Sequence, residues 1–320
     1  MEFALSEEQG ILSESIKKMF DENIGIDNLR DHSKGDKSLR RTIRRSIIDM
    51  GLPGLMIPEE YGGSGLGVLE ASLVAEQIGS YAVPSPWIGN SIMAPTAILF
   101  EKDNHLAEKW LPLIASGEIT ACISLSEVIG KRGHLGLTVN GDKVSGINIF
   151  GIDGELDPAI IITAVNNNLI LIETDNNGVE INEIPTIDST RPVVEIIFDS
   201  SNYVIIPGGK EAIQKTIDVG RIGLAGDLLG ASQNMLNKAV EYSLERKQFE
   251  RVIGSFQAVK HMCAEMAADL EPCRSLMWYA AYSQDFISDE ANLLACHAKA
   301  HLSEVGQDIA RTSTQVFGGM

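Results

Sequence analysis

The chain has 320 residues and a formal net charge of −18, from 26 lysines and arginines against 44 aspartates and glutamates. This acidity argues against a nucleic-acid-binding protein, which normally carries a basic surface, and against binding to anionic membranes. An apolar content of 44% is typical of a globular protein with a sizeable core, and the length suits two or three domains.

The cysteines show neither a CxxC pair nor zinc spacing, so we expect reduced thiols in a cytoplasmic protein. They are Cys122, Cys263, Cys273 and Cys296. The acidic first residues lack the layout of a signal peptide. The longest apolar runs, such as residues 159–162, are too short to span a bilayer.

Residues 1–117 predict an all-α domain. Ser6 and Gln9 form a capping-box pattern before a run with helical periodicity. Further helical runs follow at residues 30–50, 69–78 and 91–100 and around Trp110. Two prolines and four glycines within residues 53–65 predict a loop between two of these helices.

Residues 118–206 predict a small antiparallel β domain. Short β-prone runs lie at residues 120–125, 137–139, 143–150, 159–164, 169–173 and 193–198. Asn140-Gly141 and Asn177-Gly178 separate runs of this kind, and Asn-Gly between two β-prone runs is a hairpin signal.

Residues 207–320 predict an α-helical bundle, because three long amphipathic segments are joined by short connections. These segments cover residues 211–244, 255–283 and 289–316. The fold class is therefore α+β and multidomain, in the order helical domain, antiparallel β domain, helical bundle.

A basic and aromatic cluster, Arg246-Lys247-Gln248-Phe249, ends the first of these segments, and Gly254-Ser255 opens the next. Arginine offers a rigid fork of donors to phosphate oxygens, and a helix N-terminus offers unpaired N–H groups. The cluster therefore suits a diphosphate. A basic helix end with an aromatic core contact is the structural alternative.

Four ordered stretches give the chain a resemblance to the flavin-dependent acyl-CoA dehydrogenase family over essentially its whole length. They are residues 58–63 (PEEYGG), 146–157, 246–261 and 315–319 (QVFGG). The third is similar to the family pattern R-x-x-F-G-x-x-I-x-x-F-Q. The resemblance implies the three-domain order above, a bound FAD, an acyl-CoA substrate and the removal of two hydrogens from its thioester chain.

The resemblance also implies a set of FAD-binding residues, with Phe150 beside the flavin ring and Ser126 offering it a hydroxyl. The set is Ser124, Ser126, Phe150, Ile152, Arg246, Phe249, Phe256, Gln257, Gln315, Gly318 and Gly319. Elements like residues 246–249 and 315–319 complete the flavin site of a neighbouring subunit in the family. We therefore expect a homo- or hetero-oligomer, a dimer or tetramer, with an electron-transferring flavoprotein as the usual electron acceptor.

Three departures from the family pattern stand out. The Pro-Gly-x-Gly-Ser run that normally follows the position of Glu127 is absent, which puts the usual CoA contacts in doubt. Ile152 replaces a residue whose hydroxyl often contacts the flavin. Glu250 stands where glycine usually follows the phenylalanine.

The catalytic base of the family is not found. Asp218 and Arg221 match residues near the substrate thioester, but Gly220 stands where some members carry the glutamate. Most other members carry it beyond the position of Met320. Three hypotheses follow: a dehydrogenase whose base lies beyond Met320, a base-lacking partner subunit of a heteromeric acyl-CoA dehydrogenase, and a flavin-free scaffold of the same fold.

Other motifs have simpler interpretations. Gly65-Leu66-Gly67 lacks the third glycine and the preceding strand of a nicotinamide-binding fingerprint. His297 and His301 share a helix face without a HExxH glutamate, so we expect surface histidines and no metal. Asp188 and Arg191 indicate a structural edge of the β domain.

Overall fold

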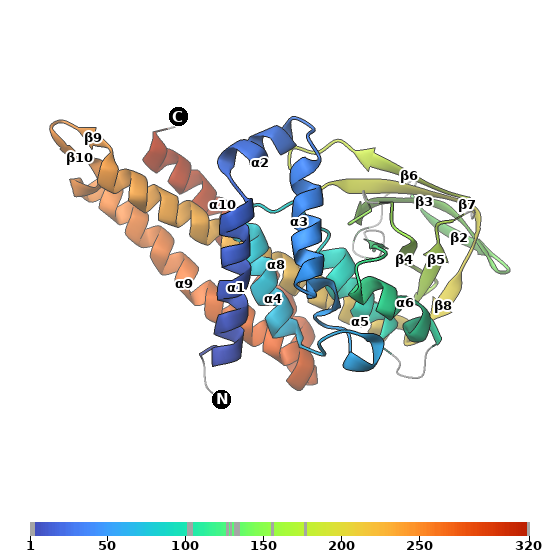
Figure 1. The fold of residues 1–320 in the computed structure, drawn as a ribbon. Coiled ribbons are helices and arrows are strands. Elements are labelled where there is room, and N and C mark those ends of the chain that lie inside the picture. Colours follow the sequence, from blue (N-terminus) through green and yellow to red (C-terminus); the bar gives the residue numbers. More distant parts are fainter. Residues whose placement is uncertain are drawn as a thin grey trace. The chain divides into compact units, whose positions relative to one another are not determined.

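The computed structural model describes residues 4–100, 105–125, 128, 130, 135–154, 157–175 and 178–318 (Figure 1). The chain divides into two compact units. Unit 1 combines Met1–Phe20, Ser72–Val83 and Arg221–Met320, and unit 2 combines Asp21–Ala71 and Pro84–Gly220. The three-domain boundaries at 117/118 and 206/207 stay a prediction beside this division.

Unit 1 is helical. It contains most of α1 (Glu7–Asn23) and α4 (Val68–Ser80), the larger part of α8 (Gly209–Glu245), and all of α9 (Gln257–Phe286) and α10 (Ser288–Phe317). The predicted capping box is confirmed at the start of α1, where Gln9 N donates to Ser6 Oγ (3.2 Å) and Ser6 N donates to Gln9 Oε1 (2.9 Å). The three long helices match the predicted segments to within a few residues.

Within unit 1, α4 and α8 pack backbone against backbone. A Cβ atom on Gly226 would stand 2.7 Å from the carbonyl oxygen of Ser72, and one on Gly230 would overlap the carbonyl of Glu76. Only glycine permits this approach. Glu76 also forms an ion pair with Arg274 of α9, whose guanidinium donates to Gln233 Oε1 as well (3.0 Å).

The helical part of unit 2 consists of short elements. They are α2 (Ile26–Ser33), α3 (Ser38–Asp49), η1 (Leu52–Gly54), η2 (Glu59–Tyr61), the π-helical turn η3 (Ile88–Met93), α5 (Ala94–Ile98) and α6 (His105–Ala115). Trp87, buried to 1% exposure, donates its indole N–H to Ala71 O at 3.1 Å. The predicted Pro/Gly loop holds η1 and η2, and Gly62 closes η2 at φ 83°.

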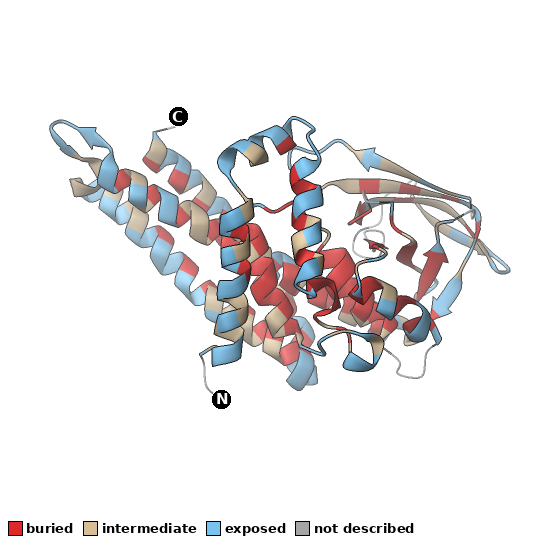
Figure 2. Ribbon diagram, viewed as in Figure 1, coloured by how far each residue is buried: buried red, intermediate tan, exposed pale blue. Residues whose placement is uncertain are grey.

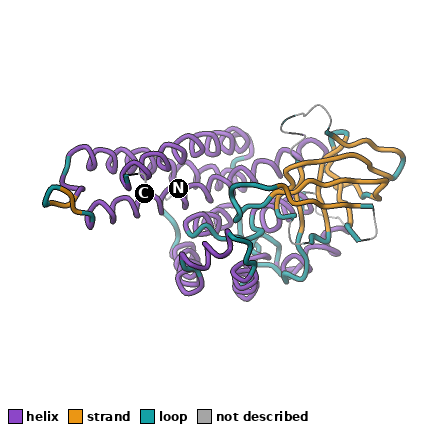
Figure 3. The backbone as a smooth tube through the Cα atoms, turned by 90° about the horizontal axis from the view of Figure 1, so that it is seen from above, coloured by secondary structure: helices purple, strands orange, loops and turns teal. Residues whose placement is uncertain are grey.

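The sheet of unit 2 has eight strands (Figure 3). They are β1 (Ala121–Ser124), β2 (Gly136–Asn140), β3 (Lys143–Ile152), β4 (Ile160–Val165), β5 (Asn168–Glu173), β6 (Val179–Ile184), β7 (Val193–Asn202) and β8 (Val204–Ile206). The strand order is β6-β7-β3-β1-β4-β5-β8, and β2 pairs with β3. Pairs are antiparallel except β1 with β4, which is parallel, so the sheet is mixed.

The predicted hairpin at Asn140-Gly141 is confirmed, since Asn140 pairs with Lys143 across a two-residue turn. Asn177 lies outside the described residues, so the second hairpin signal is not tested. Two strands escaped the sequence analysis. One is β6, in which the exposed Glu180 and Glu183 are separated by two half-buried residues, and the other is β8, whose three residues give no pattern.

One side of the sheet packs into a dense apolar cluster. Its fully buried members are Cys122, Val144, Ile161, Ile170, Ile172, Val194, Ile196 and Phe198. Figure 2 shows buried residues along the strands and along the helices of each unit. In the part of the chain that the structure describes, no helix is long and apolar enough to cross a membrane.

Candidate functional site

The end of β3 holds the predicted flavin-facing aromatic. Asn148 pairs with Ile196 on β7, but the next paired residue, Gly151, faces Val194, so β3 carries one extra residue here. Phe150 lies in this bulge with φ 59° and is 41% exposed. Bulges re-aim side chains and are frequent beside active sites. Ile123 of β1 pairs with Ile152, which brings the strand end that carries Ser124 beside the bulge.

A buried polar cluster lies under this strand end. Thr163 Oγ1 donates to Ser124 O at 2.6 Å, and Asn148 Nδ2 lies 2.6 Å from Thr163 Oγ1. Ser124 and Asn148 are each 1% exposed. Among the described residues, Ser124 Oγ and Asn148 Oδ1 find no hydrogen-bond partner. Buried polar atoms without partners are costly, and in native structures they frequently mark a place for a ligand or ordered water.

Asp153 ties the bulge to η3. Its Oδ2 accepts hydrogen bonds from the backbone N–H groups of Gly89 (2.6 Å) and Asn90 (3.0 Å) at the start of that turn. Asn90 in turn accepts from Ala121 N at 2.9 Å, at the first residue of β1. Asp153 adopts φ 60°, so two of four consecutive residues, Phe150 and Asp153, have left-handed backbone. Such strain persists only where surrounding contacts hold it, and it clusters at functional sites.

The predicted substrate-side residue Asp218 is 3% exposed and accepts a hydrogen bond from Gln214 Nε2 at 3.0 Å. Two residues later, Gly220 faces the side chain of Met93 from η3. A Cβ atom on Gly220 would stand 2.6 Å from the Met93 sulfur. Arg221 is half-buried and belongs to unit 1, whereas Asp218 belongs to unit 2.

In unit 1, the predicted phosphate cluster forms a small hairpin, β9 (Lys247–Gln248) with β10 (Arg251–Val252). Phe249 and Glu250 make its turn, with φ values of 52° and 63°. Phe249 is 86% exposed and meets the Phe256 ring edge-on at a centroid distance of 6.2 Å. The Arg251 guanidinium lies 3.9 Å from the centroid of Phe256.

The other predicted residues of unit 1 gather near this hairpin. Helix α9 begins at the exposed Gln257, directly after Phe256. The rings of Tyr242 and Phe317 lie 4.7 Å apart, and Tyr242 O accepts from Arg246 N, so the end of α10 lies beside the end of α8. Gln315 and Gly318 are exposed there. Gly319 and Ser126 fall outside the described residues.

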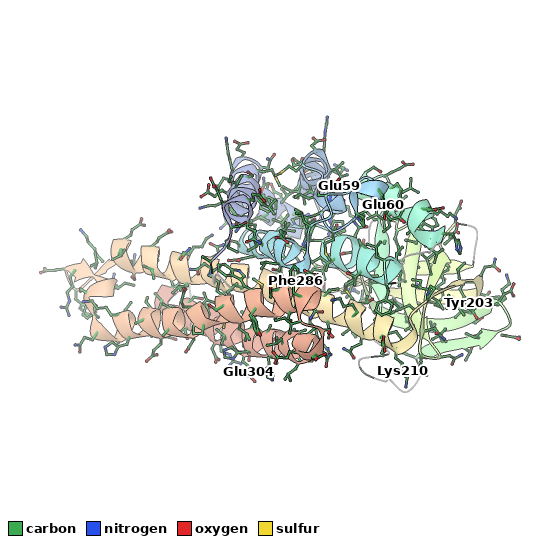
Figure 4. The ribbon with its side chains drawn as sticks, turned by 90° about the horizontal axis from the view of Figure 1, so that it is seen from below. Glu59, Glu60, Tyr203, Lys210, Phe286 and Glu304 are labelled. Atoms are coloured by element: carbon green, nitrogen blue, oxygen red, sulfur yellow. The ribbon has the colours of Figure 1, made fainter. Side chains whose placement is uncertain are left out.

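The remaining acidic and histidine candidates are surface residues or belong to local turns. Glu59 and Glu60 on η2 are exposed (Figure 4). His297 and His301 are exposed on α10, and the described residues contain no cluster of three metal-ligating side chains. Asp188 accepts from Thr190 N and Thr190 Oγ1, which is a local turn.

Sequence reasoning passed over Asn148, Asp153 and Met93. Asn148 and Asp153 lie inside the stretch singled out as residues 146–157, but their partners Thr163, Gly89 and Asn90 are distant in sequence. A buried asparagine within an apolar strand was the available signal for the first. For Met93, no signal in the sequence indicates that it faces Gly220.

Two family models match the chain. The acyl-CoA dehydrogenase N-terminal domain covers residues 6–118, and the acyl-CoA dehydrogenase C-terminal domain covers residues 208–320. The chain belongs to the acyl-CoA dehydrogenase family. This family consists of flavoprotein oxidoreductases, and the resemblance drawn from the four motifs is confirmed.

Relatives match over nearly their whole length. The short-chain-specific acyl-CoA dehydrogenase of Clostridium acetobutylicum is 26% identical over all of this chain and 90% of its own. The 3-(aryl)acrylate reductase of Clostridium sporogenes is 26% identical over 92% of this chain and 84% of its own.

Two solved structures share the fold of this acyl-CoA dehydrogenase family member. Butyryl-CoA dehydrogenase from Megasphaera elsdenii matches with a TM-score of 0.87 at 23% identity, covering 100% of this chain and 90% of that one. A chain of the ChsE4-ChsE5 complex from Mycobacterium tuberculosis matches with a TM-score of 0.89 at 23% identity, covering 100% and 88%. The predicted order of helical region, sheet and helical bundle is confirmed.

Proposed function

We propose that this chain is an FAD-dependent acyl-CoA dehydrogenase that removes two hydrogens from an acyl-CoA thioester. The observation that carries the proposal is the β3 bulge. It exposes Phe150 beside the end of β1, where the buried Ser124 hydroxyl has no partner among the described residues. An exposed aromatic and a polar strand end suit a flavin ring, which needs one flat apolar contact and hydrogen bonds at its polar edge.

The residues fit FAD in two groups. Ser124, Phe150 and Ile152 with its backbone would hold the ring, and Ser126 would add a hydroxyl. The second group would hold the diphosphate of the FAD bound in a neighbouring subunit. It consists of Arg246, Phe249, the start of α9 at Gln257 and the glycines after Gln315. Glu250, next to Phe249 in the turn of the hairpin, does not fit, because its carboxylate would repel a diphosphate.

Bound flavin supplies a two-electron acceptor for the β-hydride of the thioester chain. This chain's own contribution would be binding and orientation: Phe150 would pack on the ring, and Asp153 holds η3 against the bulge. The α-proton needs a base within hydrogen-bond reach. Gly220 has no side chain and cannot act as this base, and Glu59 and Glu60 are exposed on the surface.

A second candidate function is a base-lacking partner subunit in a heteromeric acyl-CoA dehydrogenase. Two features favour it: Met93 fills the space in front of Gly220, and Glu250 occupies the tip of the phosphate-binding hairpin. Solved relatives include the ChsE4-ChsE5 complex, a heteromeric assembly by its name. For either function we propose a cytoplasmic oligomer and an electron-transferring flavoprotein as acceptor.

The test is anaerobic addition of butyryl-CoA to the purified chain, with the absorbance of oxidised flavin as readout. Bleaching by the chain alone supports the dehydrogenase. Stoichiometric FAD without bleaching supports the partner subunit, and bleaching should then appear when the partner chain is added. Absence of FAD after reconstitution would contradict both and leave the flavin-free scaffold.

A further inference from the structure

Positive charge is concentrated in one short segment of this acidic chain. Residues 30–45 contain seven of the 26 lysines and arginines and only two acids, Asp31 and Asp36. The segment covers the second half of α2, the turn after it and most of α3. None of these cations belongs to the hairpin of β9 and β10 or to the bulge in β3.

A cavity of about 440 Å³ opens beside this segment. One wall comes from the α2–α3 region, and the other from the end of β6 and the loop that leads to β7. The lining residues with ionisable side chains are His32, Lys37, Arg40 and Glu183, and those with hydroxyls are Ser33, Thr186 and Ser189. Its volume lies within the range of roughly 300–1,000 Å³ that small-molecule sites occupy.

The cationic wall is anchored by carbonyl oxygens. Arg40, 6% exposed, donates from Nη2 to Ser189 O at 3.4 Å. His32, 5% exposed, has Nδ1 3.0 Å from Asp36 O and Nε2 3.2 Å from Ser189 O. The His32 ring therefore links the turn before α3 to the loop that leads to β7. The two walls are thus fixed to each other at the base of the cavity.

Among the described residues of these two segments, three acids accept hydrogen bonds from residues nearby in sequence. Asp36 accepts from the backbone N–H and hydroxyl of Ser38, Asp31 accepts from Lys34, and Asp188 accepts from Thr190. The exception is Glu183, whose carboxylate lies 3.7 Å from Lys37 Nζ with both side chains more than half exposed. An exposed pair of this kind contributes little free energy, so an incoming anion can compete with it.

We propose that this cavity binds a small phosphate monoester. A dianionic phosphate would meet the Lys37 ammonium at the N-cap of α3, the Arg40 guanidinium in the first turn of that helix, and the hydroxyl of Ser189 at the opposite wall. The organic part of the ligand would rest on Ile184, Pro185 and Pro192, which supply the apolar lining.

The test uses the full-length protein saturated with FAD and two probes, AMP and inorganic phosphate, in isothermal titration calorimetry. We expect saturable 1:1 binding of AMP per chain, and no binding of adenosine. If inorganic phosphate binds more weakly than AMP, the result supports a phosphate monoester as the ligand. Equal binding of both probes points to free phosphate as the natural ligand and overturns the monoester assignment.

Four variants locate the binding. Lys37→Gln should weaken AMP binding about tenfold, and Arg40→Gln should abolish it; Lys37 is exposed, so its variant decides the question if the buried Arg40 variant fails to fold. Glu183→Gln removes the competing carboxylate and should tighten binding several-fold. Arg41→Gln removes the same charge from the exposed face of α3, which does not line the cavity, and should change affinity less than twofold.

Opposite effects at Lys37 and Glu183, with no effect at Arg41, would establish the cavity as the site. Equal weakening by Lys37→Gln and Arg41→Gln would show a diffuse electrostatic attraction and overturn the proposal. Binding that survives both Lys37→Gln and Arg40→Gln would place the nucleotide elsewhere on the chain.

Discussion

The sulfur of Met93 lies 2.6 Å from the point where a Cβ atom on Gly220 would stand, and its terminal methyl carbon lies 2.9 Å away. Real Cβ atoms essentially never come closer than 3.0 Å to another heavy atom. A buried thioether therefore fills the space directly in front of this position on α8. Any side chain at position 220 would therefore overlap the Met93 side chain unless Met93 changed its rotamer.

Gly220→Glu should therefore destabilise the protein by about 1–3 kcal/mol, as overpacking of a core does, and should not by itself produce flavin bleaching with butyryl-CoA. Met93→Ala opens the space at a cost of about 2–5 kcal/mol. The double variant should be more stable than the sum of the single effects by at least about 1 kcal/mol, because the two sites share one volume. Urea unfolding of the four proteins measures this coupling, and strict additivity would contradict the packing argument.

Asp153→Ala should cost about 2–4 kcal/mol, because the N–H groups of Gly89 and Asn90 lose their acceptor. Asp153→Asn keeps an oxygen acceptor and tolerates left-handed backbone, so it should recover most of this loss. Asp157→Ala is the matched control, since exposed Asp157 also has positive φ (50°). The midpoints of urea unfolding compare the stability of these three variants with that of the wild type. A loss at Asp157 equal to that at Asp153 would assign the effect to backbone strain alone.

Glu76→Ala should destabilise unit 1 by roughly 3 kcal/mol, because the Arg274 guanidinium, whose side chain is 22% exposed, would lose its charge partner. The exposed pair of Arg311 with Asp308 (3.5 Å) provides the comparison. Asp308→Ala should change stability by less than about 1 kcal/mol. Thermal unfolding monitored by circular dichroism tests both, and similar effects would mean that the Glu76 carboxylate is solvated in solution.

The pKa of Asp36 is held below its ordinary value, first by the backbone N–H of Ser38 and then by the Ser38 hydroxyl. A carboxyl whose pKa is lower in the folded state adds stability above its unfolded pKa. That stability disappears as the pH falls through the folded pKa. Ser38→Ala removes the hydroxyl contact, so the pKa should rise toward the ordinary value of 3.8.

Carboxyl-carbon NMR titration of Asp36 measures this shift directly. The stability difference between wild type and Ser38→Ala should be present at neutral pH and vanish near the acid end of the titration. Ser46→Ala serves as control, because the Ser46 hydroxyl donates to Thr42 O on the same helix. An unchanged Asp36 titration in Ser38→Ala would contradict the assigned cause.

Much of the fold was predictable because its signals are local. The capping box of α1, the turn after Asn140 and the long amphipathic helices each depend on residues within a few positions of one another. The β1–β4 parallel pairing could not be read in this way, because four consecutive buried residues in β1 carry no alternation that indicates a partner or its direction. Likewise, β6 lacks a regular alternation, because its exposed Glu180 and Glu183 are three positions apart, and its partner β7 is not indicated by the sequence.

For the site, motif order indicated Phe150, Asp218 and the hairpin at Arg246 to Phe249, and the structure describes each of them. It could not indicate that Met93 meets Gly220 or that Asp153 reaches Gly89. These contacts join segments more than 60 residues apart in the sequence. Neither a pattern of charges nor a hydrophobic periodicity indicates that these segments meet. Whether the predicted FAD-binding residues bind FAD stays a prediction.

The bulge in β3 also inverts the alternation of buried and exposed residues. Val144 and Asn148 are buried at even positions, and the next buried residue is the odd-numbered Gly151. If residue 150 were deleted, Gly151 would move into the even series and pair with Val194 as in an unbroken ladder. The sheet can thus lose Phe150, one of the two residues that the bulge places opposite Glu195, without a change of face of the residues that follow. Its deletion should leave the unfolding midpoint nearly intact while removing the aromatic ring from the site.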